Sequence, residues 1–230
     1  MLFRSTDWSD GDASIEAMLA GAADAGHDYV CITDHATGPG MVGGVGLDDA
    51  ELREQAAEIR SAASEADVTA FAGVEANIGA GGSVSVADDV LAELDLVVAS
   101  PHSALDGDGT DRLVAAARHP DVDVLGHPTG RLLTRRPGLD VDEKRLASVC
   151  AEEGVALEVN ANPHRLDLGD DGVRAAIDAG ALIAVNTDAH APSEYGTIDF
   201  GVHTARRGWA EPADILNSHD TAGLRDFLDA

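Results

Sequence analysis

The sequence predicts an α/β fold in which helices and parallel strands alternate to form a β/α barrel. Two observations support this class. First, segments with the helical spacing of apolar residues alternate with short, fully apolar runs, which is typical of parallel strands covered by helices. Second, the length of 230 residues suits one barrel, and no linker, repeat or low-complexity tract indicates a second domain.

An amphipathic helix, a glycine and an apolar strand form the repeated unit. In the first unit, Ser14 is the expected N-cap of a helix over 14–25, Gly26 ends this helix, and a strand follows at 29–33. The later pairs are helix 48–66 and strand 68–73, helix 87–93 and strand 94–99, helix 110–118 and strand 122–125, helix 141–153 and strand 155–160, and helix 172–179 and strand 182–186. Together they give six strands, and residues 201–205 are a candidate seventh.

A closed barrel also requires a strand before the first helix. Residues 1–6 are too few and too polar to form a complete one, yet Trp8-Ser9-Asp10-Gly11 is typical of the turn that follows such a strand. We therefore expect the first strand to be largely missing or degenerate.

The predicted strands end on residues that bind metal ions. These residues are His35, Glu75, His102, His127, and Asp188 with His190. Side chains at strand ends converge on the C-terminal mouth of a β/α barrel, and histidines and carboxylates bury poorly unless they are paired or coordinated. Any one of these histidines alone is equally well explained as a packed core or rim residue. The whole set predicts a single site that holds several divalent metal ions.

The composition is strongly acidic. The chain has 15 Lys and Arg residues against 42 Asp and Glu residues, a net charge of −27, and Lys144 is its only lysine. This balance is typical of a halophilic cytosolic protein, and the alternative is a chain that repels nucleic acid. No segment has the pattern of a signal peptide or the length of an apolar membrane span. We therefore expect a cytoplasmic protein that does not associate with membranes.

Several short motifs resemble those of one family. They are Trp8-Ser9-Asp10-Gly11, Ile32-Thr33-Asp34-His35, Gly126-His127-Pro128-Thr129-Gly130-Arg131-Leu132-Leu133, Arg165-Leu166-Asp167-Leu168, Thr187-Asp188-Ala189-His190 and Ala205-Arg206-Arg207-Gly208-Trp209. On these motifs, residues 6–230 resemble the polymerase and histidinol phosphatase (PHP) family of metal-dependent phosphoesterases. Within that family the chain looks most like the C-terminal PHP domain of bacterial and archaeal family X DNA polymerases. The resemblance implies a distorted seven-stranded (β/α)7 barrel that is similar to a TIM barrel.

The resemblance also implies two or three zinc or manganese ions. The implied ligand groups are Asp10, His35 and His190 for one ion, Glu75, His102 and His127 for another, and Glu75, Asp188 and a His-x-His pair for a third. That pair would end the first strand, where this chain has Phe3 and Ser5. Neither residue replaces an imidazole ligand, so the third group is incomplete and activity would be impaired.

Two explanations for the missing pair remain open. One is a natural, degenerate domain that has lost a metal ion. The other is that residues 1–5 are not a native start, because Leu2-Phe3-Arg4-Ser5 is also the translation of CTC TTC CGA TCT, the end of a common sequencing adapter. We favour the second explanation because the other ligands are all present, and unused ligands are costly to keep buried.

Clustered divalent ions suit the hydrolysis of phosphoesters. One ion lowers the pKa of a bound water and its neighbour neutralises charge on the phosphoryl oxygens. Glu75 and Asp188, which the resemblance places at the third ion, are the expected catalytic carboxylates. The expected substrate-binding residues are Arg131, Asn160, Arg165 and Arg206. A guanidinium matches the geometry of a phosphate, although each arginine alone is at least as well explained as an ion pair on an acidic surface.

The function that the sequence favours is the 3′–5′ exonuclease portion of a family X DNA polymerase. Its substrate would be a DNA 3′ end, and a polymerase domain would lie upstream. One alternative is a free-standing phosphatase of small phosphomonoesters such as histidinol phosphate. Another is a catalytically degenerate PHP module with a structural role.

Overall fold

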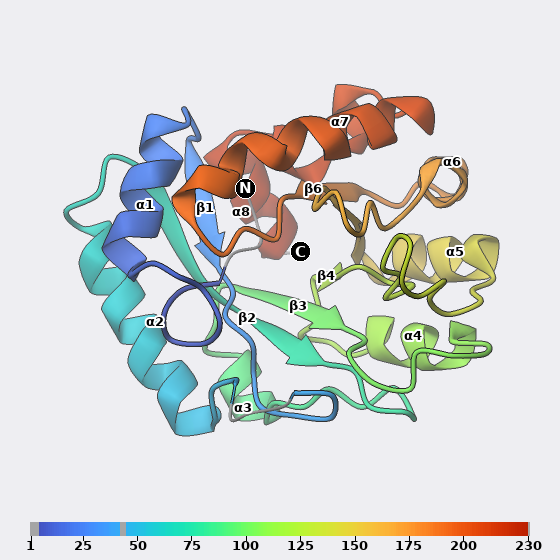
Figure 1. Ribbon diagram of the computed structural model, residues 1–230, viewed down its shortest axis with the longest axis horizontal. Helices are drawn as coiled ribbons and strands as arrows, with labels where there is room; N and C mark the ends of the chain where they lie inside the picture. The colour runs from blue at the N-terminus through green and yellow to red at the C-terminus, as the bar shows by residue number, and fades with distance from the viewer. Residues whose placement is uncertain (1–4, 42–44, 230) are drawn as a thin grey trace.

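The computed structural model describes residues 5–41 and 45–229 (Figure 1). Its centre is a sheet of six parallel strands that follow one another in sequence order and curve into half a barrel. The strands are β1 (Tyr29–Ile32), β2 (Thr69–Asn77), β3 (Leu96–Ser100), β4 (Val124–Leu125), β5 (Ala156–Asn160) and β6 (Ile183–Asn186). The predicted α/β class with parallel strands is therefore confirmed.

Helices surround this sheet, as Figure 1 shows, and most of them cover its outer side. They are α1 (Ile15–Asp24), α2 (Asp49–Ala63), α3 (Asp88–Leu91), α4 (Thr110–Ala117), α5 (Glu143–Glu153), α6 (Asp170–Ala179), α7 (Ile198–Arg207) and α8 (Thr221–Leu228). Short 3₁₀ helices are η1 (Pro192–Thr197), η2 (Pro212–Asp214) and η3 (Leu216–Ser218). None of these described helices has the length and apolar character needed to cross a membrane.

The prediction of a seventh strand at residues 201–205 is wrong, because these residues belong to α7. Gly201, Thr204 and Ala205 lie on the buried face of this helix, at the spacing of a helix rather than of a strand. A Cβ atom at Gly201 would lie 2.7 Å from Val185 of β6, so the glycine allows α7 to pack close to the sheet. The predicted first strand falls mainly on residues 1–4, which lie outside the described residues.

Local sequence signals fix where the helices begin and end. Asp48 forms a capping box with Glu51 at the start of α2, which satisfies backbone N–H groups that the helix leaves free. Gly154 and Gly180 end α5 and α6 with φ values of 74° and 82°, a left-handed conformation that glycine adopts without strain. These ends bring each following strand back to the sheet.

The sheet is buried on both faces, which explains why its strands are continuous apolar runs. Every residue of β1, β3, β5 and β6 is buried. The outer face packs against the surrounding helices. On the inner face, Leu216 of η3 and Leu224 of α8 pack against Cys31, Phe71 and other side chains near the amino ends of the strands. The C-terminal segment therefore closes this end of the half-barrel.

β6 is the last strand of the described sheet, and a side chain covers its outer edge. The amide group of Asn217 pairs with both backbone groups of Val185: its Oδ1 accepts a hydrogen bond from the Val185 N–H at 2.9 Å, and its Nδ2 donates to the Val185 carbonyl. Ile215 adds a parallel bridge to Ile183. A side-chain amide thus takes the place of a neighbouring strand.

Candidate active site

The inner face of the sheet changes from apolar to polar along each strand. Side chains alternate between the two faces of a strand, so every second residue lies on the inner face. On β2 the inner row runs Phe71, Gly73, Glu75 and Asn77, and on β5 it runs Ala156, Glu158 and Asn160. The first residue of each row belongs to the apolar cluster under α8. The polar residues therefore gather at the carboxyl ends of the strands.

Glu75 lies at the centre of the site and is fully buried. Its Oε1 atom is 3.2 Å from Nε2 of His102 and 3.0 Å from Nε2 of His127, and its Oε2 atom is 2.8 Å from Nδ1 of His35. The ring of His102 lies 5.1 Å from each of the other two imidazole rings. One carboxylate thus contacts three histidines that follow three different strands.

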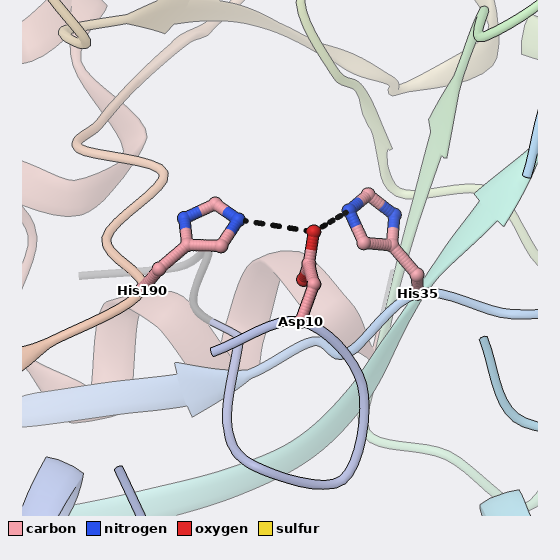
Figure 2. A group of neighbouring side chains, drawn as sticks. All are labelled: Asp10, His35 and His190. Carbon is pink, nitrogen blue, oxygen red and sulfur yellow. Dashed lines mark ion pairs between the residues drawn. The ribbon is translucent and has the colours of Figure 1, made fainter. Parts of the chain in front are cut away.

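A second group adjoins the first through His35. Figure 2 shows the carboxylate of Asp10 between two imidazoles, and its Oδ2 atom lies 3.4 Å from Nε2 of His35 and 3.4 Å from Nε2 of His190. Nδ1 of His190 is held 2.9 Å from the carbonyl oxygen of Asp188, which directs Nε2 towards Asp10. His35 therefore links the Asp10 group to the Glu75 group.

The electrostatics of the cluster favour bound positive charge. Burial opposes ionisation of Glu75, but the imidazoles of His35 and His102 outweigh it and hold the pKa of Glu75 well below its usual range. Burial also disfavours a charged His35, yet Glu75 and Asp10 raise its pKa to about 11, and Asp10 and Asp188 similarly raise the pKa of His190 to about 9. Protons and divalent cations compete for the same nitrogen atoms in such a cluster.

The donor atoms fit a divalent metal ion. Ligand atoms of Asp10, His35 and His190 all lie within 4.8 Å of one another, and so do ligand atoms of His35, Glu75 and His102. Nδ1 of His35, Oε2 of Glu75 and Nε2 of His102 are buried, and apart from the close contacts between Glu75 and these two rings they have no hydrogen-bond partner among the described residues. A coordinated ion between them would satisfy these buried polar atoms. Imidazole nitrogens with carboxylate oxygens suit zinc and manganese.

Asp188 lies on the other side of the same cavity, whose volume is about 280 Å³. Its Oδ2 atom accepts a hydrogen bond from Nδ2 of Asn160 at 3.1 Å and lies 3.5 Å from Nε of Arg165. Asp10, His35, His102, His127, Arg165 and His190 also line this cavity. Arg165 is thus the predicted phosphate-binding arginine that faces the metal-type ligands.

The other two predicted arginines have different surroundings. The guanidinium of Arg131 donates hydrogen bonds to the backbone carbonyls of Arg165 and Leu166, so it braces the loop that carries Arg165. Arg206 lies in the last turn of α7 and lines a separate cavity with Val202 and Pro212. The structure therefore brings Arg165 and Asn160 to the metal-type ligands, while Arg131 lies behind them and Arg206 lies elsewhere.

Two supporting residues hold ligands in place, and the sequence alone did not identify them. Asn77 places its Oδ1 atom 2.7 Å from Nδ1 of His102, which leaves Nε2 of that ring facing Glu75 and free to coordinate. Asp34 is fully buried and accepts hydrogen bonds from the turn that carries Asp10. The signal for Asn77 is its place in the inner row of β2, two residues beyond Glu75.

Glu158 is a third supporting residue that the sequence alone did not identify. It is fully buried on β5, and its Oε2 atom accepts a hydrogen bond from the backbone N–H of His127 at 2.7 Å. Two predicted ligands have unusual backbone angles, with φ of 25° at His127 and 52° at Asp188. Residues other than glycine adopt positive φ only when their surroundings hold them there, and such residues concentrate at functional sites.

Comparison with known proteins identifies relatives of two kinds. The DNA polymerase/3′–5′ exonuclease PolX of Bacillus subtilis is 36% identical over 231 positions, which cover 99% of this chain and 40% of the relative. A probable phosphatase of Proteus mirabilis is 31% identical and covers 69% of this chain and 66% of the relative. This chain therefore spans less than half the length of the PolX relative. No protein-family model matches the chain.

The fold is shared with solved phosphatases. A crystal structure of the histidinol phosphate phosphatase of Lactococcus lactis, complexed with zinc, L-histidinol and phosphate, matches with a TM-score of 0.61 at 14% identity and covers 91% of this chain and 94% of that chain. A histidinol phosphatase of Listeria monocytogenes matches with a TM-score of 0.60 at 12% identity over 84% and 96% of the two chains.

Histidines and carboxylates that meet at the ends of parallel strands are typical of metal-dependent hydrolases. The relatives identify one family within this class, to which both the polymerase-associated exonuclease and the phosphatases belong. The chain belongs to the polymerase and histidinol phosphatase (PHP) family. The family resemblance of its motifs is thus confirmed.

Proposed function

We propose that this chain is a metal-dependent phosphodiesterase that releases nucleotides from DNA 3′ ends, as the PHP portion of a family X DNA polymerase. The observation that carries this proposal is the 36% identity with PolX over 99% of the chain. The phosphatase relatives have lower identities of 31% and 28%. In the same proposal, residues 6–230 form the PHP domain of a cytoplasmic protein that also contains a polymerase domain.

The roles of the residues follow from their contacts. Glu75, with three histidines around it, would hold one ion, and the group of Asp10, His35 and His190 would hold another. Divalent ions bound there would lower the pKa of a water molecule and neutralise developing charge on the phosphoryl oxygens. Because the third ligand group is incomplete, Asp188 would hold its ion weakly in this chain.

The substrate phosphate would enter the cavity between Arg165 and the histidines. The guanidinium of Arg165 lies beside Asp188, where it would bind and orient a phosphoryl oxygen. Asn160 donates a hydrogen bond to the same carboxylate and would keep it directed into the cavity. Burial and the positive charge of Arg165 lower the pKa of His127 to about 4, so this ring remains neutral and can coordinate an ion.

A second candidate function is hydrolysis of small phosphomonoesters. The observation in its favour is the fold match to the phosphatase solved with L-histidinol and phosphate. Both reactions need the same ions and an arginine beside them, so the site alone supports both. The two functions differ in the substrate: a DNA phosphodiester brings a second nucleotide to the cavity, and a small phosphomonoester does not.

The test compares three substrates on one protein preparation in molar KCl. Protein loaded with Mn²⁺ or Zn²⁺ is incubated with 5′-labelled single-stranded DNA, with p-nitrophenyl phosphate and with histidinol phosphate. We expect a ladder of DNA products that shorten from the 3′ end. Hydrolysis of the monoesters alone would favour the phosphatase, and no hydrolysis would favour a degenerate module. Glu75→Gln serves as the inactive control and exposed Glu93→Gln as the matched surface control.

A further inference from the structure

The burial of Glu158 is energetically unfavourable, because its carboxyl group lies near the carboxyl groups of Asp188 and Glu75. It is 0% exposed on the inner face of β5. Two residues before it in the same row, Ala156 fills the apolar part of this face, so packing alone does not require a glutamate here. Burying a carboxyl group is unfavourable unless hydrogen bonds or nearby positive charge compensate.

The contacts of Glu158 lead to two of the predicted ligands. Its Oε2 atom accepts the backbone N–H of His127 at 2.7 Å and is 3.4 Å from Nδ2 of Asn160, and its Oε1 atom accepts from Nδ2 of Asn186 at 3.1 Å. The same Nδ2 atom of Asn160 donates to Oδ2 of Asp188 at 3.1 Å. Both oxygens of Glu158 thus have hydrogen-bond donors, so they are not directed at an ion.

These contacts support two residues whose backbone conformation is unfavourable by itself. His127 and Asp188 are the two predicted ligands with positive φ, a conformation that requires support from outside the residue. His127 belongs to the Glu75 group, whereas Asp188 lies across the cavity beside Arg165. Glu158 reaches the first directly and the second through Asn160. It therefore fixes two ligands of different groups relative to each other.

We propose that Glu158 is a positioning residue that sets the distance between the ions held at Glu75 and at Asp188. The inference rests on the proposed function, since it requires these residues to hold ions. Positive charge at both places also compensates for burying Glu158 between them. Removal of a residue that supports metal ligands typically lowers metal affinity or activity about 10- to 100-fold.

The experiment uses the whole chain in molar KCl with Mn²⁺ as the probe. Manganese content is measured after equilibrium dialysis, and electron paramagnetic resonance reports whether neighbouring Mn²⁺ ions are magnetically coupled. In the wild type we expect two tightly bound ions at the Glu75 and Asp10 groups and, at high Mn²⁺ concentration, a weaker third ion at Asp188 whose coupling to the Glu75 ion adds to the spectrum. Glu158→Leu should bind this third ion about 10- to 100-fold more weakly and lose the coupling that it adds. Glu158→Gln keeps an acceptor for the His127 N–H and should retain the coupled spectrum.

Asp123→Leu is the structural control that matches Glu158→Leu, because both remove a side-chain acceptor of a backbone N–H. Oδ2 of Asp123 accepts the backbone N–H of Val97 at 2.7 Å, the same kind of bond, but just before β4 at the opposite end of the sheet. This variant should lose stability and keep the coupled spectrum. Melting temperatures of all variants distinguish a loss of folding from a change in the distance between the bound ions.

The outcomes distinguish failure of the proposed function from failure of the proposed role of Glu158. A wild type that binds fewer than two Mn²⁺ ions overturns the proposed function itself. A coupled wild type with an equally coupled Glu158→Leu variant overturns only the role of Glu158. If Glu158→Leu does not fold, Asn160→Ala decides, because it removes the connection from Glu158 to Asp188 and leaves the Glu158 contact with His127 in place, at the cost of one further hydrogen bond from the Asn162 N–H. Loss of coupling in that variant supports the role, and unchanged coupling refutes it.

Discussion

Replacing Asp34 should release the turn that carries Asp10. Asp34 is fully buried just after β1. Its Oδ1 atom accepts the backbone N–H of Thr6 at 2.7 Å and the hydroxyl of Ser9 at 2.6 Å, and its Oδ2 atom accepts the hydroxyl of Thr6 at 2.8 Å and Nε2 of Gln55 at 2.7 Å. Asp34→Ala removes all four acceptor contacts at once.

The magnitude follows from which donors lose a partner. The Thr6 N–H, the Thr6 hydroxyl and the Gln55 amide are buried, and each unsatisfied buried donor costs about 1–3 kcal/mol. The Ser9 hydroxyl is only partly buried and can bond to water, so it adds little. We expect a loss of about 3–5 kcal/mol in the free energy of unfolding. Asp34→Asn should cost about 1 kcal/mol, because its oxygen still accepts from Thr6 and Ser9 while the Gln55 amide can rotate.

Urea denaturation in molar KCl measures these changes, and Mn²⁺ titration measures the effect on the site. Since Asp10 is held by this turn, Asp34→Ala should also weaken Mn²⁺ binding, whereas Asp34→Asn should largely preserve it. Asp7→Ala removes an exposed carboxylate from the same turn and should change stability by less than about 0.5 kcal/mol. The reasoning is refuted if Asp34→Ala costs less than about 1 kcal/mol or leaves Mn²⁺ affinity unchanged.

Three further predictions concern salt, pH and substrate. Self-repulsion at a net charge of −27 should make the melting temperature fall as KCl is reduced from molar to low concentration, and a constant melting temperature would remove the halophilic interpretation. Because the pKa of His35 is raised to about 11 and that of His190 to about 9, both rings are protonated at neutral pH and must lose a proton to bind an ion. Mn²⁺ affinity should therefore fall as pH falls, and calorimetry in buffers of different ionisation enthalpy should detect net proton release; binding without proton release would contradict these pKa directions. Arg165→Gln should raise KM for the phosphoester about tenfold or more through loss of a charged contact, while Arg174→Gln, which removes an exposed ion pair on α6, should leave KM unchanged.

The sequence predicted the alternation of helices and strands because buried parallel strands and their helices differ in period and in length. Each of the six predicted strands overlaps a strand of the structure. The error at 201–205 has a physical cause: Gly201 lies where α7 packs closely against Val185 and Ala161. A close contact between distant segments leaves no periodic signal in so short a window, so the sequence did not identify these residues as part of a helix.

The predicted metal ligands came from the strand ends and, for Asp10, from the family resemblance, and the structure places all seven around one cluster of contacts and one cavity. The supporting residues were missed for a different reason. Glu158 lies inside β5, and Asn77 is the last residue of β2, which continues past the predicted end at residue 73, so the predicted strand ends passed over both. Their importance depends on which face of the sheet they occupy. Counting in steps of two, forward from Glu75 and back from Asn160, would have placed both on the inner face of the sheet.

The amide of Asn217 on the edge of β6 has a consequence for how copies of this protein behave in concentrated solution. An exposed edge strand offers free N–H and C=O groups to any other extended chain, and this is a common route to aggregation. Asn217 occupies both groups of Val185, and its own backbone continues away through η3 instead of extending the sheet. The side chain thus blocks the pairing of β6 with a strand of another molecule. Selection on Asn217 would act on solubility, at a distance from the catalytic chemistry.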